Sequence, residues 1–210
     1  RLEIEVADAT GTWLPMLQVE VRAFTPVNPA RAVSYEQWLR LHEQADAAAP
    51  TDGPLVSVLM PVYNPPEAWL RRAIESVRGQ TYGNWELCIA NDASTAPHVR
   101  PLLYQAAAAD PRIKVVHRQA NGHISRASNS ALELATGAFT ALLDHDDELA
   151  PHALADVVRT LARRPDADLL YSDEDKIDEY GRRFAPYFKP DFLPDLFRGQ
   201  NYLTHLAVYR

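Results

Sequence analysis

Apolar and polar side chains alternate near the start of the chain, and this pattern gives way first to helical spacing and then to turn residues. Residues 2–7 and 17–24 place apolar side chains at every second position, which predicts two half-buried antiparallel strands. Residues 34–49 carry aromatic and leucine side chains at helical spacing and predict a helix. The proline- and glycine-containing segment 50–54 ends that pattern, so we expect a domain boundary near residue 53.

Beyond this boundary, short apolar runs alternate with stretches in which apolar residues recur every three or four positions. This alternation predicts an α/β fold, a Rossmann-like and mostly parallel sheet with helices on both faces, because right-handed crossovers place helices there. We therefore expect an N-terminal extension of two strands and a helix, residues 1–53, followed by an α/β domain, residues 54–210. The predicted strands are 55–60, 85–90, 113–116, 138–143 and 168–171, and the predicted helices are 65–79, 101–109, 125–136 and 151–163.

Composition narrows the possible ligands. The chain has 210 residues, is 47% hydrophobic and carries a formal net charge of −7, which is typical of one globular core with an appendage. The negative charge argues against a nucleic-acid surface or a polybasic membrane-binding face. An anionic ligand would therefore need local positive charge, for which a metal ion is the simplest source.

The sequence contains no apolar stretch of the roughly 20 residues that a membrane span requires, and no secretory signal pattern. Its single cysteine, Cys88, lies in an apolar run and predicts a buried thiol. The chain begins at Arg1 and ends within the apolar segment 202–209, so we expect a piece of a longer protein. The expected location is cytoplasmic, with any membrane association depending on parts outside this sequence.

An acidic cluster directly follows the apolar run 138–143. Asp144, Asp146 and Asp147 lie within four residues at the predicted carboxyl end of a buried strand, where open α/β sheets bind their ligands. Closely spaced carboxylates repel one another unless a cation or proton separates them, and hard oxygen ligands favour Mg²⁺ or Mn²⁺. The cluster indicates a metal and phosphate site. Alternatively, some of these acids, Glu148 above all, serve the N-terminus of the helix that Pro151 opens.

Polar residues also follow three other predicted strands: Tyr63 and Asn64 follow the first, Asp92 the second, and residues 121–126 the third. Asp92, after the strand 85–90, can accept the imide N–H of a uracil or the hydroxyls of a ribose, or can be a turn or cap residue. Asn121 and Gly122, with Arg126, offer backbone N–H groups and a cation to a diphosphate, although Asn-Gly is also a common turn.

A string of further motifs runs through the α/β domain: Pro61-Val62-Tyr63-Asn64, Ser76 with Gln80-Thr81-Tyr82, Glu86, Asn91-Asp92-Ala93-Ser94, Asn121-Gly122, Ala127 to Asn129, Gly137 and Leu143-Asp144-His145-Asp146-Asp147-Glu148-Leu149. Taken in order, these motifs resemble the family 2 glycosyltransferases over residues 55–205. Downstream segments, including 171–176, 188–191 and 200–202, resemble the bacterial branch that builds cell-surface polysaccharides, often as one module of a larger protein.

The resemblance implies the GT-A fold, a Mn²⁺ or Mg²⁺ cofactor, a nucleotide-diphosphate sugar donor, and transfer with inversion to a glycan or lipid-linked glycan acceptor. A UDP-sugar is the favoured donor, although thymidine and guanosine donors occur in the family. Asp144 and Asp146 would be the acids of the metal motif, with Asp146 the first choice for coordination and Asp147 an alternative contact to the ion or the sugar. The donor site would comprise Pro61, Val62, Tyr63, Asn64 and Asp92 at the nucleoside, Asn121, Gly122 and Arg126 near the diphosphate, and Asp144.

Inversion also needs a base for the acceptor hydroxyl, and in this family the base usually lies beyond the segment matched here. Asp173, Glu174 and Asp175 follow a predicted strand and are candidates, although they can equally be solvated loop charges. Lys189 and Asp191 either line the acceptor side or pair with each other. The remaining histidines in these loops, which we expect to be polar loop residues and not metal ligands, are His123, His145 and His205.

Two other functions stay open at this point. A sugar nucleotidyltransferase shares the architecture and the metal, but no glycine-rich loop ending in a basic residue follows the first strand of the α/β domain. A non-catalytic nucleotide-sugar-binding or scaffold module is the second alternative, because the usual base is missing from the matched segment.

Overall fold

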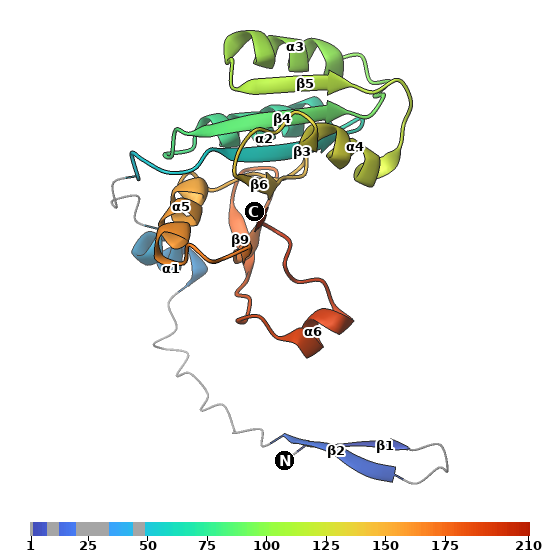
Figure 1. Cartoon of the computed structure of the whole chain (residues 1–210), viewed down its shortest axis with the longest axis vertical. Helices are drawn as coiled ribbons and strands as arrows, with labels where there is room; N and C mark the ends of the chain where they lie inside the picture. The colour runs from blue at the N-terminus through green and yellow to red at the C-terminus, as the bar shows by residue number, and fades with distance from the viewer. Residues whose placement is uncertain (1, 8–12, 20–33, 44–48) are drawn as a thin grey trace. The chain divides into compact units, whose positions relative to one another are not determined.

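The computed structural model describes residues 2–7, 13–19, 34–43 and 49–210 (Figure 1). The chain divides into two compact units, residues 1–43 and 44–210. In the first unit, strand β1 (Leu2–Ala7) pairs antiparallel with β2 (Trp13–Val19). The second strand thus begins four residues earlier than predicted, and its predicted end at residues 20–24 lies outside the described residues.

A helix, α1 (Tyr35–His42), completes the described part of the first unit. Ser34 caps it: its hydroxyl accepts a hydrogen bond from the Gln37 amide at 3.2 Å, and the Gln37 side chain accepts one from the Ser34 amide at 3.0 Å. This reciprocal pair satisfies two amides at the start of the helix that would otherwise lack partners. The helix ends seven residues before the predicted end at Ala49, and residues 44–48 lie outside the described part of the chain.

The second unit is built on a six-stranded sheet in the order β5-β4-β3-β6-β10-β7 (Figure 1). Four strands are parallel neighbours, as predicted, whereas β10 runs antiparallel between β6 and β7. The sequence predicts β3, β4, β5, β6 and β7, but it gives no assignment for β10. The strands are β3 (Val56–Val62), β4 (Trp85–Asn91), β5 (Ile113–His117), β6 (Phe139–Leu142), β7 (Leu169–Tyr171) and β10 (Ala207–Tyr209).

Helices cover both faces of this sheet, which confirms the predicted layering. Alternate residues of β3 point to opposite faces, as the pleat requires. Val58 packs in the larger core with three of the helices, and Leu59 packs in a smaller core with the fourth. On the first face lie α2 (Glu67–Arg78), α3 (Val99–Ala109) and α5 (Ala153–Arg163), and on the other lies α4 (His123–Leu132).

Cys88 is fully buried in this smaller core, as predicted, and burial raises the pKa of its thiol to about 12. A thiol with so high a pKa carries almost no thiolate at neutral pH, so we assign Cys88 a packing role only.

Two further elements follow β7 that sequence analysis did not predict. A two-stranded antiparallel hairpin consists of β8 (Glu174–Ile177) and β9 (Arg183–Tyr187), and a short helix, α6 (Pro194–Gly199), comes after it. The chain then returns to the main sheet as β10. These elements place the segment after β7 beside the carboxyl end of β6.

A buried carboxylate fixes the turn that leads into β6. Glu86 on β4 accepts hydrogen bonds from the hydroxyl of Ser57 at 2.6 Å and from the amide of Thr136 at 2.5 Å, and it pairs with Lys114 at 2.6 Å. Burial opposes ionisation, but these donors hold the pKa of Glu86 at about 2. Gly137 follows at once, and a Cβ at Gly137 would lie 2.5 Å from the backbone oxygen of Leu55. Only glycine fits this close approach.

Candidate active site

Strand register brings three chain segments to one edge of the sheet. In the antiparallel pairs, Ala207 of β10 lies opposite Leu142 of β6 on one side and opposite Tyr171 of β7 on the other. Continuing this register by two residues places His205 near Asp144, which follows β6, and near the residues that follow β7. Residues separated by more than thirty positions in the chain thus meet where β6 ends.

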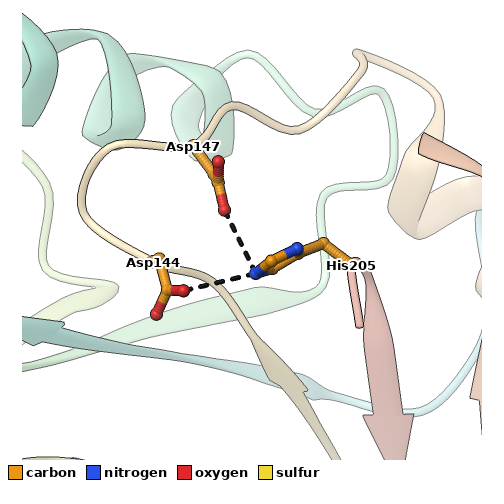
Figure 2. Close-up of side chains that lie close together, drawn as sticks. All are labelled: Asp144, Asp147 and His205. Carbon is orange, nitrogen blue, oxygen red and sulfur yellow. Dashed lines mark hydrogen bonds and ion pairs between the residues drawn. The ribbon is translucent and has the colours of Figure 1, made fainter. Parts of the chain in front are cut away.

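The centre of the site is a cluster of two carboxylates and one imidazole (Figure 2). The Nε2 atom of His205 lies 3.3 Å from Oδ2 of Asp144 and 3.5 Å from Oδ2 of Asp147. One ligand atom from each of these residues lies within 4.8 Å of the others. The cluster therefore offers a negatively charged, three-sided binding position for a cation.

The pKa values of the cluster follow from these contacts. The hydrogen bond to Asp144 raises the pKa of His205 to about 9, with a smaller contribution from the charge of Asp147. The same hydrogen bond lowers the pKa of Asp144. Burial raises the pKa of Asp147, and neighbouring carboxylates raise it further against the opposing effect of His205. In the metal-free protein, a protonated His205 supplies the positive charge that the carboxylates require.

The sequence predicts Asp144 and Asp146 as the metal ligands. The structure instead brings Asp144 together with Asp147 and His205. The loop turns between Asp144 and Asp147, where the Asp147 amide donates to the carbonyl of Asp144 at 3.2 Å. The carboxylates of these two residues lie together beside His205. Asp146 is exposed and lies outside this cluster. The sequence predicts His205 to be a polar loop residue. No local pattern shows that the strand after it, β10, pairs with β6.

Two carboxylates and an imidazole fit a divalent ion. Carboxylate oxygens are preferred by Mg²⁺ and Mn²⁺, whereas an imidazole nitrogen is a common ligand for the later transition metals. The mixed set of Asp144, Asp147 and His205 is therefore better suited to Mn²⁺ than to Mg²⁺.

Helix α2 holds the acidic loop that carries Asp144 and Asp147. Its Arg72 pairs with Glu148 at 2.5 Å, and the hydroxyl of Ser76 accepts a hydrogen bond from the amide of Leu149 at 3.1 Å. The side-chain amide of Gln80, at the end of this helix, donates to the carbonyl of Ala150 at 2.8 Å. Glu148 thus pairs with an arginine on α2. The loop is fastened at three successive residues directly after the carboxylates.

A second group of predicted residues lies at the ends of β3 and β4. Tyr63 is 48% exposed, which leaves its ring free to stack on a base. Asn64 adopts a left-handed backbone with φ of 49°, and its side chain accepts hydrogen bonds from the amides of Thr95 and Ala96 at 2.8 and 2.9 Å. The loop after β3 is thereby tied to the loop after β4. Pro61 is joined to the acidic loop, since its carbonyl lies 3.1 Å from Nδ1 of His145.

Asp92 is buried and already paired. Its side chain is 2% exposed, and its carboxylate accepts hydrogen bonds from Nε of Arg118 at 2.7 Å and from the amide of Gly122 at 3.0 Å. Arg118 also donates to the hydroxyl of Ser130 at 2.6 Å. Sequence analysis did not single out Arg118, since a lone arginine after an edge strand carries no local signal. Asp92 therefore links the end of β4 to the start of α4, where Arg126 is exposed.

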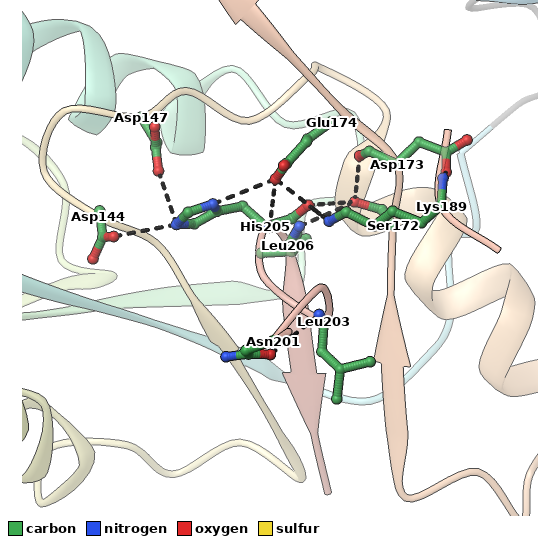
Figure 3. A network of polar contacts seen from close by, with 10 residues as sticks. All are labelled: Asp144, Asp147, Ser172, Asp173, Glu174, Lys189, Asn201, Leu203, His205 and Leu206. Carbon is green, nitrogen blue, oxygen red and sulfur yellow. Dashed lines mark hydrogen bonds and ion pairs between the residues drawn. The ribbon is translucent and has the colours of Figure 1, made fainter. Parts of the chain in front are cut away.

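The segment after β7 surrounds His205 with polar contacts (Figure 3). One oxygen of Glu174 accepts a hydrogen bond from the His205 amide at 2.7 Å and lies 3.4 Å from its Nδ1 atom. Burial opposes ionisation of Glu174, but the His205 amide and the Lys189 ammonium hold its pKa below the ordinary value. Asp173 is exposed, and its carboxylate accepts a hydrogen bond from the Lys189 amide at 2.7 Å. The ammonium of Lys189 pairs with Glu174 at 3.4 Å, and not with Asp191 as one of the two predicted alternatives had it.

The sequence profile of Glycosyl transferase family 2 matches residues 57–209. The chain belongs to this family. The O-antigen biosynthesis protein RfbC of Myxococcus xanthus is 38% identical over 192 residues, which are 88% of this chain and 15% of that protein. The names of the family and of this relative agree with the glycosyl transfer and polysaccharide biosynthesis that the resemblance implied.

Two solved structures show the same fold. The mannosyltransferase PcManGT from Pyrobaculum calidifontis, in complex with GDP-Man and Mn²⁺, is 25% identical with a TM-score of 0.53, and the match covers 66% of this chain and 41% of that one. S. aureus TarS 1–349, in complex with UDP-GlcNAc, is 25% identical with a TM-score of 0.52, covering 60% of this chain and 36% of that one. These likenesses confirm the predicted GT-A architecture.

The matched region is short compared with the full length of these relatives. This chain spans 17% and 15% of the lengths of two curated family 2 relatives. In the part of the chain that the structure describes, no helix combines the length and apolar character needed to cross a membrane.

Proposed function

We propose that this domain transfers a sugar from a nucleotide-diphosphate donor to a cell-surface glycan acceptor, with inversion at the anomeric carbon. The observation that carries the proposal is the cluster of Asp144, Asp147 and His205 at the carboxyl end of β6. It lies on the same edge as the loops after β3 and β4, where a nucleoside would be bound. The family and the two nucleotide-sugar complexes of similar fold support it.

The donor would lie along this edge. Tyr63 would stack on the base, since its ring is half exposed beside the loop that Asn64 ties to β4. Asp92 would act mainly by holding Gly122 and the start of α4 in place, because its carboxylate is buried and paired. Arg126, exposed on the first turn of α4, would face the diphosphate. UDP is the favoured nucleotide.

Asp144, Asp147 and His205 would hold the divalent ion, for which Mn²⁺ is the better candidate. When bound, such an ion supplies positive charge against the diphosphate that leaves. His205 must then give up the proton on Nε2, so the ion replaces the charge of the histidinium between the two carboxylates. We predict that binding of the metal releases protons at neutral pH.

On the acceptor side, a base removes the proton of the acceptor hydroxyl. The hydroxyl oxygen then bonds to the anomeric carbon from the face opposite the diphosphate, whose bond to that carbon breaks. Asp173 is the best of the three candidate bases in this chain because it is exposed, whereas the carboxylate of Asp175 pairs with Arg183. Glu174 is less suited, since its oxygen is occupied by His205 and Lys189.

Calorimetric titration tests the donor site. The 210-residue chain is titrated with UDP, GDP and dTDP, each with and without Mn²⁺, and the titrations are repeated on Asp144→Asn and Asp147→Asn. Asp166→Asn is the matched control, because Asp166 is an exposed acid between α5 and β7, away from the carboxyl end of β6.

We expect one nucleotide to bind, more tightly with Mn²⁺, and both site variants to lose the gain from the metal while Asp166→Asn retains it. Binding that is indifferent to Mn²⁺ and to both site variants would contradict the metal-dependent donor site. A folded protein that binds none of the three nucleotides would favour a scaffold role.

A further inference from the structure

Lys189 is an unusual residue in this domain because its charged side chain is buried. The side chain is 1% exposed, although Lys189 lies just after the β8–β9 hairpin, in a segment of partly exposed residues. A buried ammonium is costly unless it is paired and hydrogen-bonded, and an apolar residue of similar size often gives equal or better stability. A lysine buried at this position therefore points to a requirement for geometry.

The partners of Lys189 are both parts of one small assembly around His205. The ammonium donates to the backbone carbonyl of His205 at 2.7 Å and pairs with Oε2 of Glu174 at 3.4 Å. That same oxygen of Glu174 accepts from the His205 amide at 2.7 Å and lies 3.4 Å from His205 Nδ1. Figure 3 shows Glu174 in contact with both His205 and Lys189.

Together these contacts hold three of the four polar groups of His205. The amide and Nδ1 face Glu174, and the carbonyl faces Lys189. The remaining polar atom, Nε2, faces Asp144 and Asp147 at 3.3 and 3.5 Å. The imidazole is thereby fixed with one nitrogen directed at the acidic loop.

This is the arrangement that an imidazole needs in order to bind a metal through Nε2. A neutral histidine must carry its proton on Nδ1 to leave the Nε2 lone pair free, and a carboxylate at Nδ1 selects that tautomer. Such a carboxylate also fixes the ring and strengthens the nitrogen as a ligand. Given the proposed metal-dependent function, on which this step rests, we propose that Glu174 and Lys189 are positioning residues that present His205 Nε2 to the metal.

The hairpin β8–β9 then has a definite role. It supplies Glu174 from its first residue and leads to Lys189 two residues after its last, so folding of the hairpin sets the position of His205. The Asp175–Arg183 pair, at 2.6 Å, lies on the same hairpin and provides a matched comparison.

The test is the dissociation constant of Mn²⁺, measured on the full 210-residue chain from the EPR signal of free Mn²⁺. The variants are Glu174→Gln, Lys189→Met, His205→Ala and the double variant Glu174→Gln/His205→Ala, with Asp175→Asn as the control. Thermal unfolding and circular dichroism establish that each variant is folded. Glu174→Gln keeps the shape of the side chain, so it tests the inference even if Lys189→Met does not fold.

We expect Glu174→Gln to weaken Mn²⁺ binding about tenfold or more, which is the usual range for residues that orient a metal ligand. Lys189→Met should change it in the same direction. In the His205→Ala background, Glu174→Gln should have no further effect, because it acts through His205. Asp175→Asn should leave Mn²⁺ affinity unchanged even where it lowers thermal stability.

Unchanged Mn²⁺ affinity in folded Glu174→Gln, or an equal loss in the presence and absence of His205, would overturn this inference while leaving the metal site intact. If His205→Ala binds Mn²⁺ as tightly as the native chain, or the native chain binds none, the metal assignment itself fails and the inference fails with it.

Discussion

The pKa of His205 gives a prediction for the metal-free protein that does not depend on any ligand. Contacts with Asp144 and Asp147 raise the pKa of this imidazole from 6.5 to about 9 in the folded state. The folded state therefore binds the proton more tightly than the unfolded chain does. The resulting stabilisation is fully present below about pH 6.5 and is lost as the pH rises through about 9.

The size of this effect follows from the shift and the exposure of the side chain. At about 1.4 kcal/mol per pKa unit, the shift corresponds nominally to about 3 kcal/mol. The His205 side chain is 49% exposed, so solvent screens its ion pairs, and pairs of this kind contribute about 1 kcal/mol or less. We expect about 1 kcal/mol.

The assay is urea unfolding of the native chain and His205→Gln in EDTA, at intervals from pH 6 to pH 10. The difference in free energy of unfolding between them should shrink by about 1 kcal/mol over this range. His123→Gln, which removes an imidazole from the exposed first turn of α4, controls for the loss of a histidine. A difference that is constant with pH would refute the assignment of a charged His205 to this cluster.

Three other predictions concern the fold and the nucleoside site. Glu86→Gln should lower the free energy of unfolding by about 3 kcal/mol at pH 7, measured in urea. This loss should diminish as the pH falls from 4.5 towards 2, because the native carboxylate itself becomes protonated there. Gly137→Ala should cost about 2 kcal/mol in the same assay, because its Cβ would meet the Leu55 carbonyl. Tyr63→Ala should weaken binding of the preferred nucleotide, measured by calorimetry, about tenfold without changing the midpoint of thermal unfolding. The ring is half exposed and would stack on the base. Unchanged affinity would exclude stacking by Tyr63.

The parallel half of the sheet could be predicted because its information is local. Strands β3, β4 and β6 are short apolar runs bounded by proline, glycine or polar residues, and each is followed by a helix with an apolar stripe. Such strands are buried on both faces, so the acids after β6 had to lie at a ligand-binding edge. The sequence therefore located Asp144 in the fold before any contact was known.

The antiparallel strand β10 could not be predicted in the same way. Three residues, Ala207–Tyr209, are too few to show a period, and their pairing with β6 joins positions more than sixty residues apart. Register between distant strands depends on packing across the whole sheet. His205 owes its place in the site to this pairing, and the apolar residues that follow it were the available signal.

The choice among the acids depended on a single turn. Asp144, Asp146 and Asp147 are equivalent in charge and close in sequence. The structure joins Asp144 and Asp147 through a turn, in which the Asp147 amide donates to the Asp144 carbonyl, and through their shared contact with His205. Likewise, the pairing of Asp92 with Arg118 arises from the parallel register of β4 and β5, which places Asn91 opposite His117. Sequence patterns give the element on which such residues lie, but not the partner that each side chain faces.

The most direct test of the metal-dependent donor site is a crystal structure of the chain with Mn²⁺ and the nucleotide that binds it best, with anomalous difference density recorded for manganese. We predict one peak within bonding distance of Asp144, Asp147 and His205 Nε2, with the diphosphate of the nucleotide bound to the same ion. A manganese peak on Asp146 alone, with His205 still hydrogen-bonded to Asp144, would contradict the site proposed here.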